Sequence, residues 1–299
     1  MTAAGSPPFF VVGAPRSGTT MLRLMLDSHP QLAVPFESGF IVDFYRRQAQ
    51  YGDLSVRDNA ARMLRDIGDH PMVRKGRLIP DSEAVLARSV RTYSDLADAI
   101  FRAYAQAQGK ERWGDKTPGY VTDIDVLRAV FPTCRIVHLV RDGRDVALST
   151  RNVEWGMRSL PRIAADWRWN TILAHKVGSV LGGDYLLIRY EDLVLEPEAN
   201  LRSIAAFLDV PYTEAMLNYP QNGAEKMPAV SMQWHGNSVR PPEASLVGQW
   251  RRVMSRSDRI IFEQCARDAL EMFGYDLERH PSTFGSRLRT LYYSTLRRY

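Results

Sequence analysis

The stretch FFVVGAPRSGTT, residues 9–20, decides the fold class of this chain. Four consecutive apolar residues, 9–12, are typical of a buried strand in a parallel sheet. A glycine-containing turn follows and leads into the amphipathic pattern of residues 19–27, which predicts a helix. Because the N–H groups at the start of such a helix attract anions, the turn is also a candidate phosphate-binding loop.

The same order of strand, loop and helix occurs twice more along the chain. Residues 135–140 predict a strand, followed by a helix over about 145–152. Residues 184–189 predict another strand, and a helix over 198–208 begins after a proline whose fixed φ suits a first helical turn. Strands that alternate with helices indicate an α/β fold with a central, mainly parallel sheet.

Three segments fall outside this alternation. About a hundred residues of mostly helical pattern separate the first two clear strands, which predicts a helical insertion over about 39–110, including a helix over 82–91. Glycine, proline, asparagine and serine accumulate over 220–242, which we interpret as a long, lid-like loop. The tail, 279–299, carries five arginines and no acidic residue. We expect one domain over residues 1–299.

Composition narrows the class of protein. With 299 residues, 45% of them hydrophobic and 24% charged, the chain has the composition of a folded globular protein. The net charge is +5, and since the tail accounts for it, a nucleic acid is not an expected partner of the main domain. No apolar run reaches the roughly 18 residues of a membrane span, and the first residues lack the basic region of a signal peptide, so we expect a cytoplasmic protein.

The glycine turn departs from the usual nucleotide-triphosphate loop at one position. In register with G-x-x-x-x-G-K-[ST], the turn has Gly13, Gly18 and Thr20, but Thr19 replaces the lysine. That lysine normally reaches the β- and γ-phosphates of a nucleoside triphosphate, so its absence weakens the interpretation as a kinase or NTPase. Arg16 supplies a cation from inside the turn instead.

These residues resemble a known family. The segment Pro15-Arg16-Ser17-Gly18-Thr19-Thr20 is similar to the 5′-phosphosulfate loop of the sulfotransferases, whose donor is 3′-phosphoadenosine 5′-phosphosulfate (PAPS). The resemblance continues through residues 26–30, where it is greatest to tyrosylprotein sulfotransferases and related bacterial enzymes. It covers about residues 8–252 and implies a three-layer, P-loop-like fold with PAPS as co-substrate. It also implies donor contacts from Arg16, Ser17, Gly18, Thr19 and Thr20.

A PAPS site needs a second anion site for the 3′-phosphate. An arginine at the end of a strand can hold a phosphate through two hydrogen bonds. In the family this arginine is followed by a serine eight residues later, which matches Arg141 and Ser149. The resemblance also places Tyr190 beside the nucleotide. Residues 248–252 resemble the segment that closes over the donor, but Gln249 replaces a lysine of the tyrosylprotein enzymes, and Arg251 is the candidate to supply that charge.

Sulfuryl transfer needs a base for the acceptor proton and a cation for the leaving oxygen. Glu37 follows Pro35 and Phe36, an apolar flank that favours a raised carboxyl pKa. Lys116, one of only five lysines, lies at a predicted strand end. The resemblance implies the catalytic base for Glu37 and the cation for Lys116. No metal is expected, because the best candidate strand ends in Arg141 and not in a metal-binding carboxylate.

The sequence therefore predicts a PAPS-dependent sulfotransferase. One alternative is a P-loop kinase of a small hydroxylated substrate, and another is a nucleotide-binding or partner-binding module without catalysis. The acceptor stays open among a tyrosyl peptide, a glycan, a lipid and a small molecule, because the recognisable motifs concern the donor. The basic tail leaves membrane association and a homodimer contact open as well.

Overall fold

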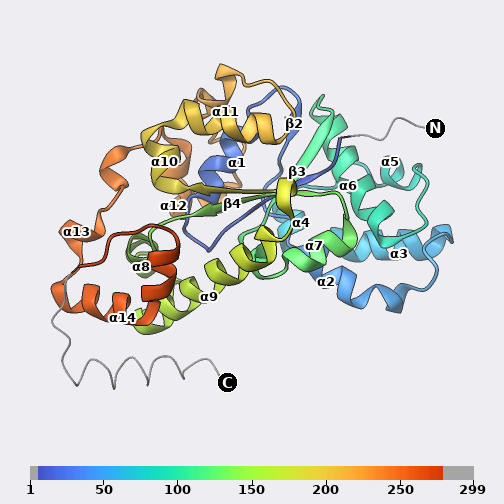
Figure 1. Ribbon diagram of the computed structural model, residues 1–299. Coiled ribbons are helices and arrows are strands. Elements are labelled where there is room, and N and C mark those ends of the chain that lie inside the picture. Colours follow the sequence, from blue (N-terminus) through green and yellow to red (C-terminus); the bar gives the residue numbers. More distant parts are fainter. Residues whose placement is uncertain (1–5, 279–299) are drawn as a thin grey trace.

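The computed structural model describes residues 6–278, which form helical layers around one parallel sheet (Figure 1). The sheet has five strands in the order β2-β3-β1-β4-β5, and every neighbouring pair is parallel. The strands are β1 (Phe9–Val12), β2 (Leu32–Ala33), β3 (Arg112–Lys116), β4 (Arg135–Val140) and β5 (Tyr185–Arg189). The carboxyl ends of these strands meet at one edge, which is where ligands of such sheets bind.

Both faces of the sheet are covered, as the alternating side chains of β1 show. Phe9 and Val11 pack into a buried cluster with one set of helices, and Phe10 and Val12 pack into a second cluster with another set. On the first face lie α1 (Thr19–Asp27), α10 (Tyr190–Leu195) and α11 (Pro197–Phe207); on the second lie α7 (Ile124–Val130) and α9 (Leu160–Ser179), with α8 (Gly143–Arg151) and α14 (Arg256–Met272) beside α9 (Figure 1). The predicted three-layer α/β fold is confirmed.

The segment between β2 and β3 is helical. It contains α2 (Phe40–Arg47), α3 (Arg57–Gly68), α4 (Pro71–Gly76), α5 (Ser82–Leu86) and α6 (Tyr93–Ala107). The predicted helix over 82–91 was too long, since α5 ends at Leu86. The next helix is capped at Thr92, whose side chain accepts from Asp95 N while the Asp95 carboxylate accepts from Thr92 N, so the preceding residues form the connection.

A glycine lets β3 lie tightly beside β1. Gly114 pairs with Phe9, and a Cβ atom at Gly114 would lie 2.3 Å from the Phe9 ring. The same register pairs Lys116 with Val11, at the end of β1. The strand pairing therefore brings Lys116 to the start of the candidate phosphate loop, although the two segments are a hundred residues apart.

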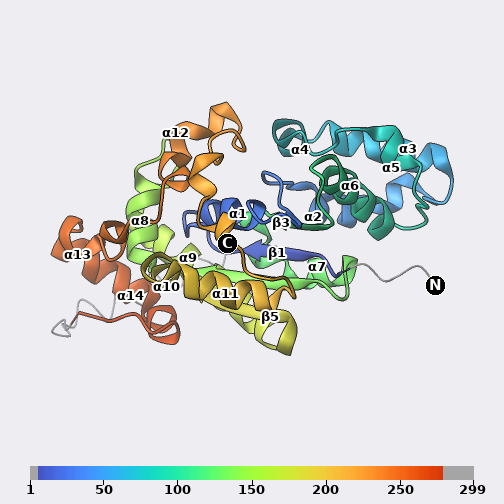
Figure 2. The same ribbon diagram turned by 90° about the horizontal axis from the view of Figure 1, so that it is seen from above.

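The segment predicted as one irregular loop over 220–242 contains short helical elements. They are three short 3₁₀ segments, Tyr219–Gln221, Ala229–Ser231 and Gly236–Val239, with α12 (Met232–His235) between the last two. Long-range donors hold its backbone: Arg16 binds the carbonyl of Trp234, and Arg23 binds that of Lys226. Figure 2 shows α12 on one side of α1 and the insertion helix α4 on the other. The basic tail, 279–299, lies outside the described residues.

No helix among residues 6–278 combines the length and the apolar character that crossing a bilayer requires.

Candidate active site

The turn between β1 and α1 is built around two residues with positive φ. Arg16 has φ 71° and Gly18 has φ 91°. At Gly18 a side chain is also excluded by contact, because a Cβ atom would lie 2.4 Å from the ring of Tyr190. Ser17, 1% exposed, has a hydroxyl with no hydrogen-bond partner among the described residues. A buried, unpaired hydroxyl beside the start of α1 fits an anion bound in this turn.

The two predicted anion sites adjoin each other. Arg16 Nε donates to Ser149 Oγ at 3.0 Å, and Arg141 Nη1 donates to the Arg16 carbonyl at 3.4 Å. The Arg141 guanidinium lies 4.4 Å from the centre of the Tyr190 ring. Burial, and secondarily the charge of Arg141, lowers the pKa of Arg16. The structure thus brings together four predicted donor residues, Arg16, Ser149, Arg141 and Tyr190. Two guanidinium groups this close repel each other, and an anion bound between them would relieve that repulsion.

Two backbone carbonyl groups from residues 234–246 accept hydrogen bonds from Arg16 and Arg141. Arg16 Nη2 donates to the Trp234 carbonyl at 3.0 Å, and Arg141 Nη2 donates to the Leu246 carbonyl at 3.1 Å. Leu246 ends a short 3₁₀ helix, Ala244–Leu246. Residues 231–246, which line the cavity, are thus fixed to Arg16 and Arg141, the two cations that the resemblance assigns to the donor.

Glu37 and Lys116 form a buried pair at the entrance to α1. Lys116 Nζ lies 2.7 Å from Glu37 Oε1 and 3.3 Å from Thr20 Oγ1. The side chain of Lys116 is fully buried, whereas that of Glu37 is 18% exposed. Burial lowers the pKa of Lys116, and the Glu37 carboxylate partly opposes that effect. A carboxylate, an ammonium and a hydroxyl thus meet beside the candidate phosphate loop.

Three polar residues that the sequence analysis did not single out brace this pair. Ser38 Oγ donates to Asp115 Oδ2 at 2.6 Å, and Ser38 N donates to Thr117 Oγ1 at 3.1 Å. Thr117 Oγ1 in turn donates to Asp115 Oδ2 at 3.2 Å. Since Ser38 follows Glu37 and Asp115 precedes Lys116, these bonds fix the two chain segments against each other. The Asp-Lys-Thr run around Lys116 was the available signal.

Helix α1 holds the segment before Glu37 from the other side. Arg23, 1% exposed, donates through Nε to the carbonyls of Val34 at 2.9 Å and Pro35 at 3.2 Å. Asp27 accepts from Val34 N at 2.9 Å. The sequence alone gives no reason for an arginine on the buried face of a helix. The hydrogen bonds of Arg23 show that it holds the segment before Glu37 in place.

A cavity of about 640 Å³ is lined by most of the predicted residues, with Ser17 and Arg251 not among the lining residues. Its donor side has Arg16, Gly18, Thr19, Thr20, Arg141, Ser149, Tyr190 and Gln249, and its other side includes Glu37, Met21, Phe36, Met72, Lys75, Trp155 and Trp234. Lys116 lies just behind this lining, in contact with Glu37. The volume of the cavity is in the range of pockets that hold small ligands and cofactors.

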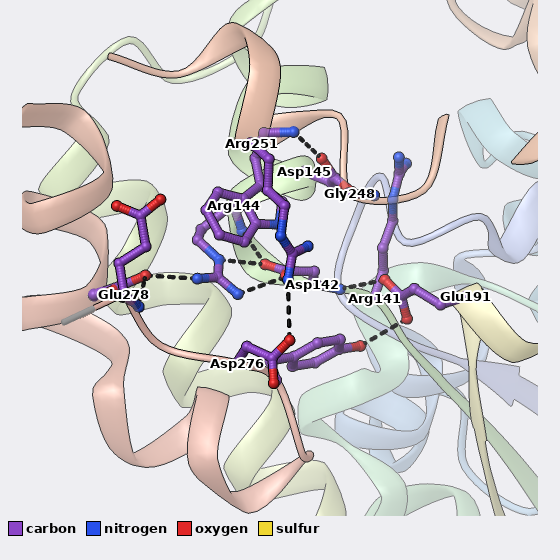
Figure 3. A network of polar contacts seen from close by, with 12 residues as sticks. Arg141, Asp142, Arg144, Asp145, Glu191, Gly248, Arg251, Asp276 and Glu278 are labelled. Atoms are coloured by element: carbon purple, nitrogen blue, oxygen red, sulfur yellow. Dashed lines mark hydrogen bonds and ion pairs between the residues drawn. The ribbon is translucent and has the colours of Figure 1, made fainter. Parts of the chain in front are cut away.

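Arg251 is a predicted donor residue whose guanidinium lies away from the cavity. Its guanidinium pairs with Asp276 at 3.1 Å and lies 4.5 Å from the Trp250 ring (Figure 3). Gln249 lines the cavity instead. The turn is set by Asp145, whose carboxylate accepts from Gly248 N at 2.9 Å and Trp250 N at 2.8 Å, so Arg251 points away from the donor side.

A network behind the donor side supports the loop after β4. Arg144 donates to Asp142 at 2.8 Å and to Glu263 at 2.6 Å, and it lies 3.5 Å from the Trp250 ring. Glu191 accepts from Asp142 N at 2.9 Å (Figure 3). These groups are buried, which gives Arg144 a structural role and leaves Arg141 as the cation of this loop that faces the cavity.

The fold and the site define the class of protein: a P-loop-like α/β protein with two adjoining arginines at the carboxyl edge of its sheet. A sequence model described as the sulfotransferase family matches residues 7–214. The chain belongs to the sulfotransferase family and is a PAPS-dependent sulfotransferase. This membership sets aside the kinase alternative and confirms the resemblance seen in the loop.

Known relatives agree with this assignment. The chain is 23% identical to protein-tyrosine sulfotransferase A of Caenorhabditis elegans, covering 94% of this chain and 70% of that protein. It is 25% identical to the protein-tyrosine sulfotransferase of Drosophila melanogaster, covering 93% of this chain and 54% of that protein. Among solved structures, the sulfotransferase domain of the Synechococcus PCC 7002 olefin synthase matches with a TM-score of 0.64 and 26% identity, over 92% of this chain and 96% of that domain.

Within residues 6–278, no three His, Cys, Asp or Glu side chains come together in a metal-ligand group.

Proposed function

We propose that this enzyme transfers the sulfuryl group of PAPS in line to an acceptor hydroxyl, with Glu37 as the base and Lys116 as the cation at the leaving oxygen. The observation that carries the proposal is the 2.7 Å contact of Lys116 Nζ with Glu37 Oε1, beside Thr20 at the start of α1. It combines a proton acceptor and a stabiliser of negative charge at one point.

The donor would lie along the line of predicted cations. The N–H groups at the start of α1, with Arg16, Ser17 and Thr20, would bind the 5′-phosphosulfate. Arg141 and Ser149 would bind the 3′-phosphate. The unpaired Ser17 hydroxyl and the facing guanidinium groups of Arg16 and Arg141 support this placement, since each gains a partner from an anion.

The reaction then needs one proton transfer and one displacement. The acceptor O–H gives its proton to the Glu37 carboxylate while its oxygen forms a bond to sulfur. The bond between sulfur and the bridging oxygen breaks, and the electron pair stays on the phosphate of the product, 3′-phosphoadenosine 5′-phosphate (PAP). Lys116 stabilises that oxygen as charge develops on it, and its burial strengthens the interaction.

The acceptor would reach Glu37 from the apolar side of the cavity, past Phe36, Trp155 and Trp234. The protein-tyrosine sulfotransferases among the relatives support a hydroxyl as the accepting group. Aromatic walls suit an acceptor with an apolar or aromatic body next to its hydroxyl.

The test is calorimetric titration of the protein with PAP and with ATP plus Mg²⁺, followed by turnover of Glu37→Gln with labelled PAPS and a panel of phenols and alcohols. We expect PAP to bind more tightly than ATP. We expect Glu37→Gln to lower turnover about a hundredfold or more, because a general base contributes that much, with PAP affinity nearly unchanged. Glu198→Gln, on the exposed face of α11, is the matched control. An equal loss of PAP affinity and turnover in Glu37→Gln would assign Glu37 a structural role instead.

A further inference from the structure

Helix α4 places a lysine on the acceptor side of the cavity. The helix packs against the segment that carries Glu37, since a Cβ atom at Gly76 would lie 3.4 Å from Phe36 Cβ. Lys75 precedes Gly76 and lines the cavity together with Met72 of the same helix. Its position is therefore tied to the backbone next to the proposed base.

The Lys75 ammonium lies among aromatic rings. Its Nζ is 5.3 Å from the centre of the Phe36 ring and 5.9 Å from that of Trp234. Lys116 Nζ lies 5.5 Å from the centre of the same Phe36 ring, so both ammonium groups are neighbours of this ring. Trp155, 56% exposed, packs edge-on against Trp234 and extends this wall outward. Rings and a second cation thus continue outward from the catalytic pair.

Other lysines near the site differ from Lys75 in their partners. Lys110 and Lys226 both pair with Asp27, and Lys116 pairs with Glu37. Among residues 6–278, no carboxylate lies within ion-pair distance of Lys75, whose contacts are with the two rings. A cation held in a pocket by aromatic faces and without a carboxylate keeps its charge for a ligand.

We infer that the acceptor is a small hydroxylated carboxylic acid with an apolar or aromatic body, and that Lys75 binds its carboxylate. The inference rests on the proposed function, because it assumes that the hydroxyl lies at Glu37. The size of the cavity argues for a small acceptor: about 640 Å³ has to hold the nucleotide donor as well. A carboxylate near Lys75 would direct the body of the acceptor along Phe36 and its hydroxyl toward Glu37.

The experiment measures binding to the full-length protein saturated with PAP. Its probes are 3-phenylpropionate and the neutral 3-phenylpropanamide, which lack a hydroxyl and so cannot react. We expect the acid to bind roughly fivefold more tightly than the amide, as for a partly exposed ion pair. Lys75→Met should remove this preference and Lys75→Arg should keep it. Lys176→Met, on the exposed face of α9, is the matched control and should behave as the wild type. PAP affinity should stay the same in all variants.

Three outcomes would overturn the inference. Equal binding of the two probes by the wild type means that the carboxylate is not recognised. A loss of PAP affinity in Lys75→Met means that Lys75 belongs to the donor site. Tighter binding of the peptide acetyl-Glu-Tyr-Glu-amide than of 3-phenylpropionate, lost in Lys75→Met, means that an acidic peptide and not a small acid is the acceptor. Failure of the proposed function shows elsewhere, in the PAP titration and in the turnover of Glu37→Gln.

Discussion

Asp115 is the buried carboxyl that joins the strand of Lys116 to the segment of Glu37. Burial raises its pKa from 3.8 to about 6, although hydrogen bonds from Ser38 and Thr117 partly oppose the shift. Because the pKa in the folded state lies above that of the unfolded chain, the protonated carboxyl stabilises the fold at low pH. This contribution is lost as the pH rises through about 6.

Asp115→Asn should remove this pH dependence. The amide oxygen still accepts from Ser38 and Thr117 but cannot ionise. We expect the free energy of unfolding of the wild type, relative to the variant, to fall by about 2 kcal/mol between pH 4 and pH 7. Urea denaturation at several pH values measures it, with the exposed Asp58→Asn as the control. A difference that does not change with pH would contradict the prediction.

At the scale of residues, the sequence singles out the proposed catalytic pair but not the residues that hold this pair in place. Glu37 and Lys116 were predicted separately, and the structure brings them within 2.7 Å. Arg23 and Ser38 were missed, because their partners lie on other segments and no local pattern records a hydrogen bond across the fold. Arg251 was predicted from its charge and its neighbourhood in the sequence, but the hydrogen bonds of Asp145 turn it away from the cavity.

At the scale of elements, the phosphate loop and helix α10 depend on each other through one close contact. The ring of Tyr190, the first residue of α10, fills the space where a side chain at Gly18 would lie. Gly18 also has a φ of 91°, which L-residues adopt at a cost of about 1–2 kcal/mol. A side chain at position 18 therefore meets two separate obstacles.

A double-mutant cycle separates the two obstacles. Gly18→Ala alone should lower the free energy of unfolding by about 3 kcal/mol, from backbone strain and contact with the ring together. In the background of Tyr190→Ala the same substitution should cost only about 1 kcal/mol, because the contact is gone. Chemical denaturation of the four proteins gives the coupling energy. Strict additivity would show that Tyr190 does not limit the loop.

Elements with a strong local pattern were predicted well. The strands over 9–12 and 135–140 have the predicted bounds, because short and mainly apolar runs are typical of buried strands in a parallel sheet. The helix predicted over 82–91 was too long, since the cap of the next helix sets its end. The segment over 220–242 was predicted as irregular, but arginines from α1 and from the phosphate loop order its backbone.

At the scale of the whole molecule, Arg144 connects the sheet to the last described helix. It joins Asp142, at the end of β4, to Glu263 of α14, and its guanidinium stacks on Trp250. All three charged side chains are nearly inaccessible to solvent. Removing the arginine would take away the cation that joins these two buried carboxylates.

Arg144→Met should therefore lower the free energy of unfolding by about 3–5 kcal/mol. Urea denaturation measures this loss. Arg202→Met is the control, since it removes an exposed pair with Glu198 one turn away on α11 and should cost no more than about 0.5 kcal/mol. Similar effects of the two substitutions would mean that the buried network adds little to stability.

Several sequence-based expectations concern the molecule beyond its described part. The division into a single domain, the cytoplasmic location and a homodimer contact through the basic tail stay predictions. These three expectations depend on the protein surface and on the chain termini, where few buried contacts limit which residues can occur. The sheet and its carboxyl edge, in contrast, follow from the apolar patterns of buried strands.

The carbonyls of Trp234 and Leu246 occupy the two arginines that the proposed function assigns to the donor. In that proposal, a phosphate would compete with each carbonyl for its guanidinium group, and the carbonyl contact would form again when PAP departs. The measured affinity is then a difference between two sets of hydrogen bonds, as for any ligand that displaces a bound partner. A simple anion such as sulfate could replace only one carbonyl per ion. A nucleotide with phosphates at both ends would replace both within one molecule, and this linkage of two contacts would favour the long donor over simple anions.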